Sequence, residues 1–136
     1  MARDIVLTNV YGIDIGRATR DVDFAVAVAN WDQFNLVKRR LIETGRFNAS
    51  NKAEQRVYYR TRENNTGFPV DIIPFGGVES PPQSIAWPSE KQIIMNVVGY
   101  AETLETALSV RIDKEIVVAV ASLPGLALLK LFAWQD

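Results

Sequence analysis

Three aspartates stand in settings where carboxylates could do chemistry. Asp21 and Asp23 lie two residues apart at the start of an apolar, alternating run that predicts a β-strand over residues 22–28. Side chains at i and i+2 of a strand project from one face, roughly 6 to 7 Å apart. Ala25 and Ala27 continue this face and suggest that it is partly covered. Because adjacent buried carboxylates need a compensating cation, the pair predicts a divalent-metal site. The alternative is two solvated side chains on an open strand face.

Asp71 supplies a third carboxylate. It lies in an apolar strand expected over residues 68–74, where a lone aspartate is out of place without a partner. If this strand pairs beside the first, three carboxylates converge on one face. Two metals ~3.5–4 Å apart could then clamp the attacking and leaving oxygens of a phosphoryl transfer. The alternative is that Asp71 ends a turn and faces water.

The composition narrows the chemistry further. The 136 residues include no cysteine and no histidine, which excludes Cys/His zinc sites, cysteine nucleophiles and Ser-His-Asp triads. Carboxylates without soft ligands suit Mg²⁺ or Mn²⁺. The net charge of −1 gives no long-range attraction to nucleic acid or to a membrane. With no signal peptide and no apolar run of ~20 residues, we expect a cytoplasmic protein that does not enter a membrane.

The elements that must position these aspartates follow from periodicity. An amphipathic helix is predicted over residues 31–44, capped by Asn30 or Asp32 and ended by Gly45, with Lys38 outside its apolar stripe. Residues 5–7 fit a strand or a short helix. The other predicted strands are residues 55–60, 92–98, 110–112 and 116–121. Two further helices are predicted, one over residues 100–108 and a last one capped by Ser122. The predicted loops are residues 47–55 and 75–88.

This order predicts an α+β fold, a mixed β-sheet flanked by α-helices, in one domain over residues 1–136. Trp31 and Trp134 are predicted to pack in the core, and Trp87 to fill the long loop. The Gly76-Gly77 pair is interpreted as a turn and not as a phosphate loop.

A family resemblance rests on four segments. Residues 16–24, Gly-Arg-Ala-Thr-Arg-Asp-Val-Asp-Phe, resemble the D-x-D segment of AbiEii-like minimal nucleotidyltransferases. Residues 70–73 resemble their later strand with the third carboxylate, and residues 128–133 are similar to their L-x-K-x-x-A helix. Residues 2–7 look like the R-D-x-L helix of the tRNA nucleotidyltransferase branch. The resemblance implies a nucleotidyltransferase-like fold across nearly the whole chain.

The resemblance also implies roles. Asp21, Asp23 and Asp71 would be the catalytic, metal-binding carboxylates, holding Mg²⁺ or Mn²⁺. The residues that would bind the triphosphate are Arg17, Thr19, Arg20 and Lys130, although solvated side chains are an equal alternative for the arginines and the lysine.

The implied reaction transfers a nucleoside monophosphate from a nucleoside triphosphate to a hydroxyl of a tRNA or protein acceptor. The AbiEii-like branch further implies a toxin with an antitoxin partner. The family's Gly-Gly or Gly-Ser pair is missing before the helix at residues 2–7, so we expect a chain trimmed at both ends or a divergent member. The rival hypothesis is therefore a catalytically inactive binding module with this fold.

A weaker hypothesis is a nucleic-acid binder. Tyr58 and Tyr59 stand beside Arg56, Arg60 and Arg62, a combination that can stack on bases and bind phosphates. The favoured alternative is an edge strand with solvated arginines.

Overall fold

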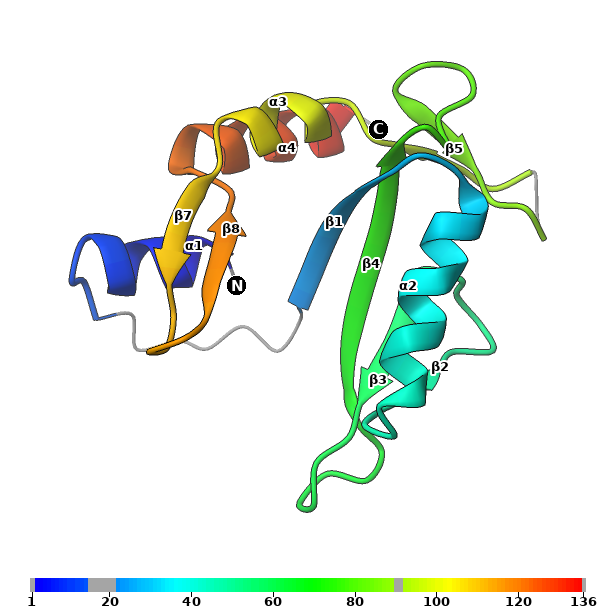
Figure 1. Ribbon diagram of the computed structural model, residues 1–136. Coiled ribbons are helices and arrows are strands. Elements are labelled where there is room, and N and C mark those ends of the chain that lie inside the picture. Colours follow the sequence, from blue (N-terminus) through cyan, green and yellow to red (C-terminus); the bar gives the residue numbers. More distant parts are fainter. Residues whose placement is uncertain (1, 15–21, 90–91, 136) are drawn as a thin grey trace. The chain divides into compact units, whose positions relative to one another are not determined.

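The computed structural model describes residues 2–14, 22–89 and 92–135 (Figure 1). The chain divides into two compact units, residues 20–95 and residues 1–19 with 96–136. Asp21 and the predicted phosphate-binding residues Arg17, Thr19 and Arg20 lie outside the described residues.

The unit of residues 20–95 is built on a mixed four-stranded sheet. Its strands are β1 (Val22–Val28), β2 (Phe47–Ala49), β3 (Arg56–Tyr59) and β4 (Phe68–Gly76), in the spatial order β1-β4-β3-β2. β1 and β4 are parallel, whereas β3 pairs antiparallel with both β4 and β2. The predicted strands at residues 22–28, 55–60 and 68–74 and the predicted α+β class are confirmed.

Three expectations about the strands of this region were wrong. Residues 47–49 form a strand and not a loop, because they pair along β3. β3 itself lies between β4 and β2, so it is not an edge strand. The predicted loop over residues 75–88 contains the strand β5 (Ser84–Ala86), which pairs with β6 (Ile94–Asn96) in a two-stranded ribbon.

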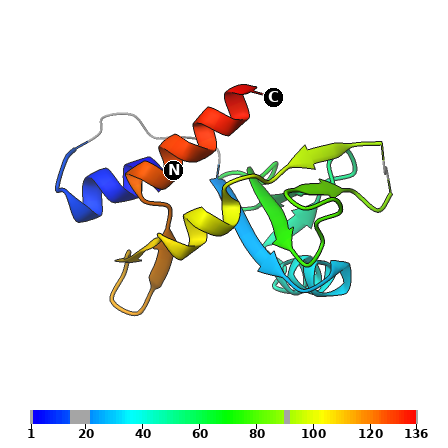
Figure 2. The same cartoon turned by 90° about the horizontal axis from the view of Figure 1, so that it is seen from above.

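Helix α2 (Trp31–Glu43) covers one face of the four-stranded sheet, as Figures 1 and 2 show. The Asn30 carboxamide oxygen accepts from the Gln33 backbone N–H (2.9 Å) and the Gln33 side chain accepts from the Ala29 N–H (2.6 Å), a reciprocal cap that starts the helix. Gly45, at φ +73°, ends it, as predicted.

An aromatic cluster joins α2 to the segment after β4. The Trp87 ring lies 5.4 Å from Trp31 and 5.8 Å from Phe34, centroid to centroid. Phe34 and Trp87 are buried, whereas Trp31, whose ring contacts both, is half-buried. The predicted packing of Trp87 is confirmed, and Trp31 packs against the core without being buried in it. Lys38 was expected outside the apolar stripe, but it is half-buried, with its Nζ donating to the Glu54 carbonyl oxygen and lying 5.7 Å from the Phe34 ring centroid.

Alternation along the strands separates two faces of this sheet. The covered face carries buried side chains on all three long strands, namely Val28, Val57, Val70, Ile72 and Pro74. Phe24 belongs to the same face by register but is 52% exposed. The opposite face carries Asp23, Ala25 and Ala27, which are exposed, and Phe75, which pairs with Ala27 and is buried. This face is thus partly covered, as expected, but at Phe75 on β4 and not at the side chains of β1.

The unit of residues 1–19 and 96–136 has a small core of its own. Its elements are α1 (Ala2–Ile5), the π-helix η1 (Val6–Val10), α3 (Tyr100–Glu105), the hairpin of β7 (Leu108–Arg111) and β8 (Val117–Val120), and α4 (Leu123–Gln135). Val6, Val110 and Val120 form the buried cluster between helix and hairpin. Residues 5–7 are thus helical. The Ser122 hydroxyl accepts from the Gly125 N–H (3.2 Å), which confirms it as the cap of α4.

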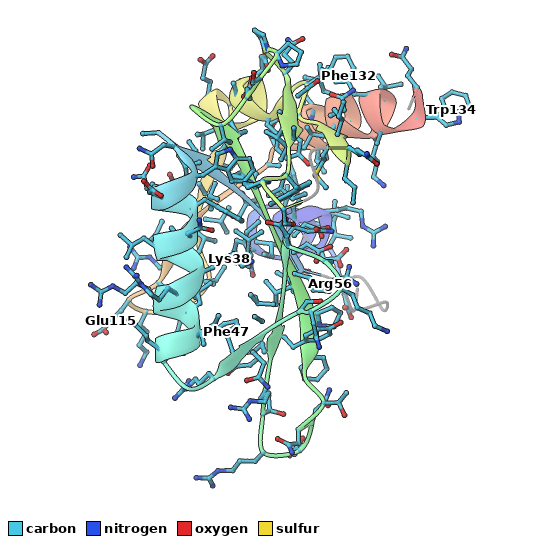
Figure 3. The ribbon with its side chains drawn as sticks, turned by 90° about the vertical axis from the view of Figure 1, so that its right-hand side faces the viewer. Lys38, Phe47, Arg56, Glu115, Phe132 and Trp134 are labelled. Atoms are coloured by element: carbon cyan, nitrogen blue, oxygen red, sulfur yellow. The ribbon has the colours of Figure 1, made fainter. Side chains whose placement is uncertain are left out.

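Helix α4 differs from expectation at its end. Trp134 was predicted to be a core residue but is 87% exposed, and Figure 3 shows its ring extending from the end of the helix. Across the described residues, no helix combines the length and the apolar character needed to cross a membrane.

Candidate functional site

The site is a row of three charged residues on the face of the sheet opposite α2. Asp23 on β1 lies directly opposite Asp71 on β4, and Asp71 lies directly opposite Arg56 on β3. Directly paired residues on neighbouring strands point to the same face. Figure 3 shows Arg56 on the side of the sheet away from α2. Two of the three predicted carboxylates are therefore brought together, as the strand-pairing hypothesis required.

Arg56 binds Asp71 through both carboxylate oxygens. Its Nε donates to Oδ1 (2.7 Å) and its Nη2 donates to Oδ2 (2.8 Å). The Asp71 side chain is 18% exposed and that of Arg56 is 38% exposed. The hydrogen bonds from Arg56 to Asp71, and then the charge of Asp71, raise the pKa of Arg56. Asp71 therefore has a partner. The alternative interpretation, in which Asp71 ends a turn and faces water, was wrong.

The donors in this row fit a hard cation. Two carboxylates at one register position offer oxygen ligands only, and Mg²⁺ is commonly held by one or two carboxylates together with substrate phosphates. No cluster of three or more carboxylate, cysteine or histidine side chains forms a metal site within the described ranges. The third predicted ligand, Asp21, lies outside those ranges. The two described carboxylates fit Mg²⁺, with Arg56 as a competing cation on Asp71.

The remaining predicted phosphate ligand is Lys130. It lies on α4 and is exposed, and among the residues that the structure describes it has no hydrogen bond or ion pair. Its predicted role stays a prediction.

The Gly76-Gly77 pair forms a turn, as interpreted. The Gly76 N–H donates to Glu79 Oε1 (2.7 Å) and the Gly77 N–H donates to the Val28 carbonyl oxygen (2.8 Å). Both backbone donors are therefore used within the protein and are not presented to a phosphate. A Cβ on Gly77 would come within 2.0 Å of the Ala29 carbonyl oxygen, so the turn requires glycine by close approach.

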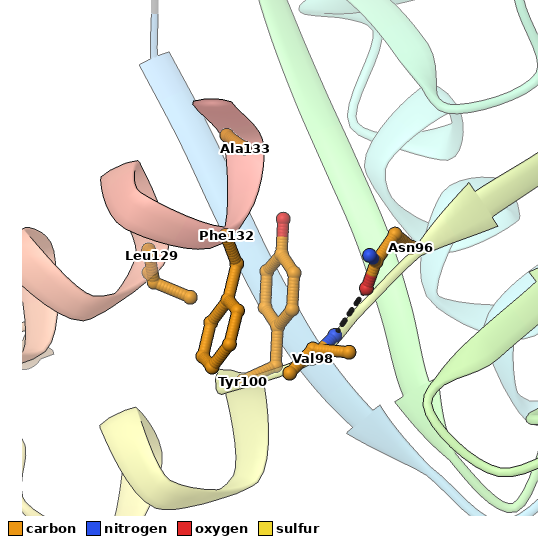
Figure 4. Close-up of a pocket in the computed structure, with 6 residues that line it drawn as sticks. All are labelled: Asn96, Val98, Tyr100, Leu129, Phe132 and Ala133. Carbon is orange, nitrogen blue, oxygen red and sulfur yellow. Dashed lines mark hydrogen bonds between the residues drawn. The ribbon is translucent and has the colours of Figure 1, made fainter. Parts of the chain in front are cut away.

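A small pocket lies elsewhere, in the unit that contains α4 (Figure 4). Its volume is about 70 Å³, and its lining residues are Asn96, Val98, Tyr100, Leu129, Phe132 and Ala133. Sites for small organic ligands usually enclose about 300 Å³ or more. This pocket is too small for a nucleotide.

Sequence reasoning missed the place of Arg56. It grouped Arg56 with Tyr58 and Tyr59 as a strand for nucleic acid, whereas the side chain belongs to the carboxylate row. The signal that could have found it was the alternation of residues 56–59, which puts Arg56 on the face opposite the buried Val57.

The mixed sheet, with helix α2 on one face and two directly paired carboxylates on the other, has the α+β architecture of a nucleotidyltransferase-like fold. The family model described as "Nucleotidyl transferase AbiEii toxin, Type IV TA system" matches residues 5–136. The chain belongs to this AbiEii family of nucleotidyl transferase toxins, and the predicted family is confirmed. No curated protein and no solved structure matches the chain.

Proposed function

We propose that this chain is a Mg²⁺-dependent nucleotidyltransferase that transfers a nucleoside monophosphate from a nucleoside triphosphate to a hydroxyl of a tRNA or protein acceptor. The observation that carries the proposal is the direct pairing of Asp23 with Asp71 on the face of the sheet opposite α2. The family description supports the reaction class, and its mention of a toxin–antitoxin system supports an antitoxin as partner protein.

The proposed roles follow from the positions of the carboxylates. Asp23, with Asp21 two residues before it, would hold Mg²⁺, and Mn²⁺ could replace it. When bound, the metal would offset the negative charge of the triphosphate and of the transition state. Asp71 would complete the metal site and accept the proton of the acceptor hydroxyl.

The proposed reaction balances as a single displacement. The acceptor oxygen forms a bond to the α-phosphorus, the bond from that phosphorus to the bridging oxygen breaks, and pyrophosphate leaves. The other proposed groups are the phosphate donors Arg17, Thr19, Arg20 and Lys130, whose N–H and O–H groups suit phosphate oxygens.

One observation favours the alternative, a domain that keeps the fold without catalysis. Both oxygens of Asp71 are bound by Arg56, which leaves this carboxylate less able to bind a metal or a proton. A transfer assay separates the two functions.

The assay incubates the protein with Mg²⁺, each of the four ribonucleoside triphosphates labelled at the α-phosphate, and purified tRNA. Label on tRNA or on the protein, together with released pyrophosphate, is the expected result. Asp23→Asn should lower transfer about 100-fold or more, whereas the control Asp32→Asn, an exposed aspartate on α2, should not change it. A wild-type chain that transfers no label to either acceptor would favour the inactive alternative.

A further inference from the structure

Arg56 is the one member of the charged row that the proposed reaction does not use. It is fixed by its position in β3, directly opposite Asp71, and its two hydrogen bonds of 2.7 and 2.8 Å match the fork of a guanidinium to the two oxygens of a carboxylate. Arginine and lysine are not equivalent in this role, because only the planar guanidinium binds both oxygens at once.

We propose that Arg56 is a positioning residue that occupies Asp71 in the metal-free site and yields it when a divalent cation binds. The inference rests on the proposed function, since it assumes that Asp71 is a metal ligand. A guanidinium held to both oxygens puts a positive charge where the cation must bind, and two cations on the same carboxylate repel each other.

The exchange is energetically accessible. The Arg56 side chain is more than one third exposed, and ion pairs in such settings are weak because water screens them. A divalent cation offers the carboxylates twice the charge of the guanidinium. Once released, the guanidinium can bind a phosphate group in the same two-pronged way.

The test is the affinity for Mn²⁺ alone, followed by the paramagnetic signal of the free ion. Arg56→Gln is expected to bind Mn²⁺ about tenfold more tightly than the wild type, a coupling of ordinary size for two linked ligands. Arg56→Lys should give a smaller gain, since it keeps the charge but loses the fork. The gain of Arg56→Gln should disappear when Asp71→Asn is added, because Arg56 acts through Asp71. A chemical unfolding curve for each variant checks that it is folded. If Arg56→Gln does not fold, the Mn²⁺ affinity of Arg56→Lys is compared with that of the wild type instead.

Two controls sharpen the result. Arg62→Gln removes the same charge from an exposed loop position and should leave Mn²⁺ affinity unchanged. Equal or weaker binding in both Arg56→Gln and Arg56→Lys would overturn the inference while leaving the metal site intact, and so would an equal gain in Arg62→Gln. Mn²⁺ binding that Asp23→Asn does not weaken would instead count against the proposed metal site itself.

Discussion

Asp23 and Asp71 occupy directly paired positions on neighbouring parallel strands, although they are 48 positions apart in the chain. The pairing of β1 with β4 runs from Val22–Val70 to Val28–Gly76 without interruption, which fixes the register of the two carboxylates. A shift by one residue would turn one of them to the face that α2 covers. The sheet therefore holds the two acids together through its backbone and not through a flexible loop.

The Arg56–Asp71 ion pair should contribute measurably to stability. Because both hydrogen bonds are charge-assisted and the pair is partly shielded from water, we expect a coupling energy of about 1 kcal/mol. A double-mutant cycle with Arg56→Gln, Asp71→Asn and both changes together measures it by urea unfolding. Additive effects of the two single changes would contradict a direct interaction.

The aromatic cluster on α2 should be the main anchor of the segment after β4. Phe34 is buried and contacts both Trp31 and Trp87, so Phe34→Ala is expected to lower the free energy of unfolding by about 3–5 kcal/mol. Leu36→Ala, at an exposed position of the same helix, is the control and should lower the free energy of unfolding by much less. Similar losses for the two variants would argue against the cluster as a core.

The turn at Gly77 should reject any side chain. The Cβ of an alanine at position 77 would lie 2.0 Å from the Ala29 carbonyl oxygen, so the backbone must move to make room for it. Gly77→Ala is therefore expected to lower the free energy of unfolding by about 1–3 kcal/mol or more. Gly45→Ala is a useful comparison, because nothing lies near that Cβ and only its positive φ is unfavourable, at about 1 kcal/mol. Thermal unfolding of the two variants checks the order, and a larger loss for Gly45→Ala would contradict it.

Lys38 should make stability depend on pH in the alkaline range. Burial lowers its pKa from the ordinary 10.5, although Glu54 opposes the change. The folded chain therefore loses this proton at a lower pH than the unfolded chain, so stability rises as the pH increases from the folded pKa toward 10.5. Below the folded pKa, the buried charge is a constant cost.

Comparison with Lys38→Met isolates this effect. The difference in unfolding free energy, wild type minus variant, should become more favourable to the wild type as the pH approaches 10.5 from below. Urea unfolding at several pH values measures it. A difference that stays flat or falls across this range would show that the pKa of Lys38 is not lowered.

The elements with strong local signals were predictable from sequence. The alternation of residues 22–28 matched β1, and the Asn30 cap and Gly45 set the ends of α2. Short elements were not predictable, because their stability comes from pairing. β2 is three residues long and includes the polar Asn48, so only its antiparallel contact with β3 makes it a strand.

The candidate site was predictable in part. The unusual position of Asp71 in an apolar strand indicated a partner, and the facing of Asp23 and Asp71 followed if the strands paired. The contact with Arg56 requires the register of β3 on β4, which the sequence of the connecting residues 60–67 does not specify. The prediction that Trp134 is buried was wrong for another reason. Helix α4 is apolar on all faces, so periodicity cannot tell which face is buried.

The central claim is tested most directly by equilibrium binding of the four ribonucleoside triphosphates to the wild type, Asp23→Asn and Asp32→Asn, with and without Mg²⁺. The account predicts that at least one triphosphate binds the wild type and Asp32→Asn only when Mg²⁺ is present, and that Asp23→Asn abolishes this binding. Triphosphate binding that needs no metal, or that Asp23→Asn leaves intact, would contradict the account.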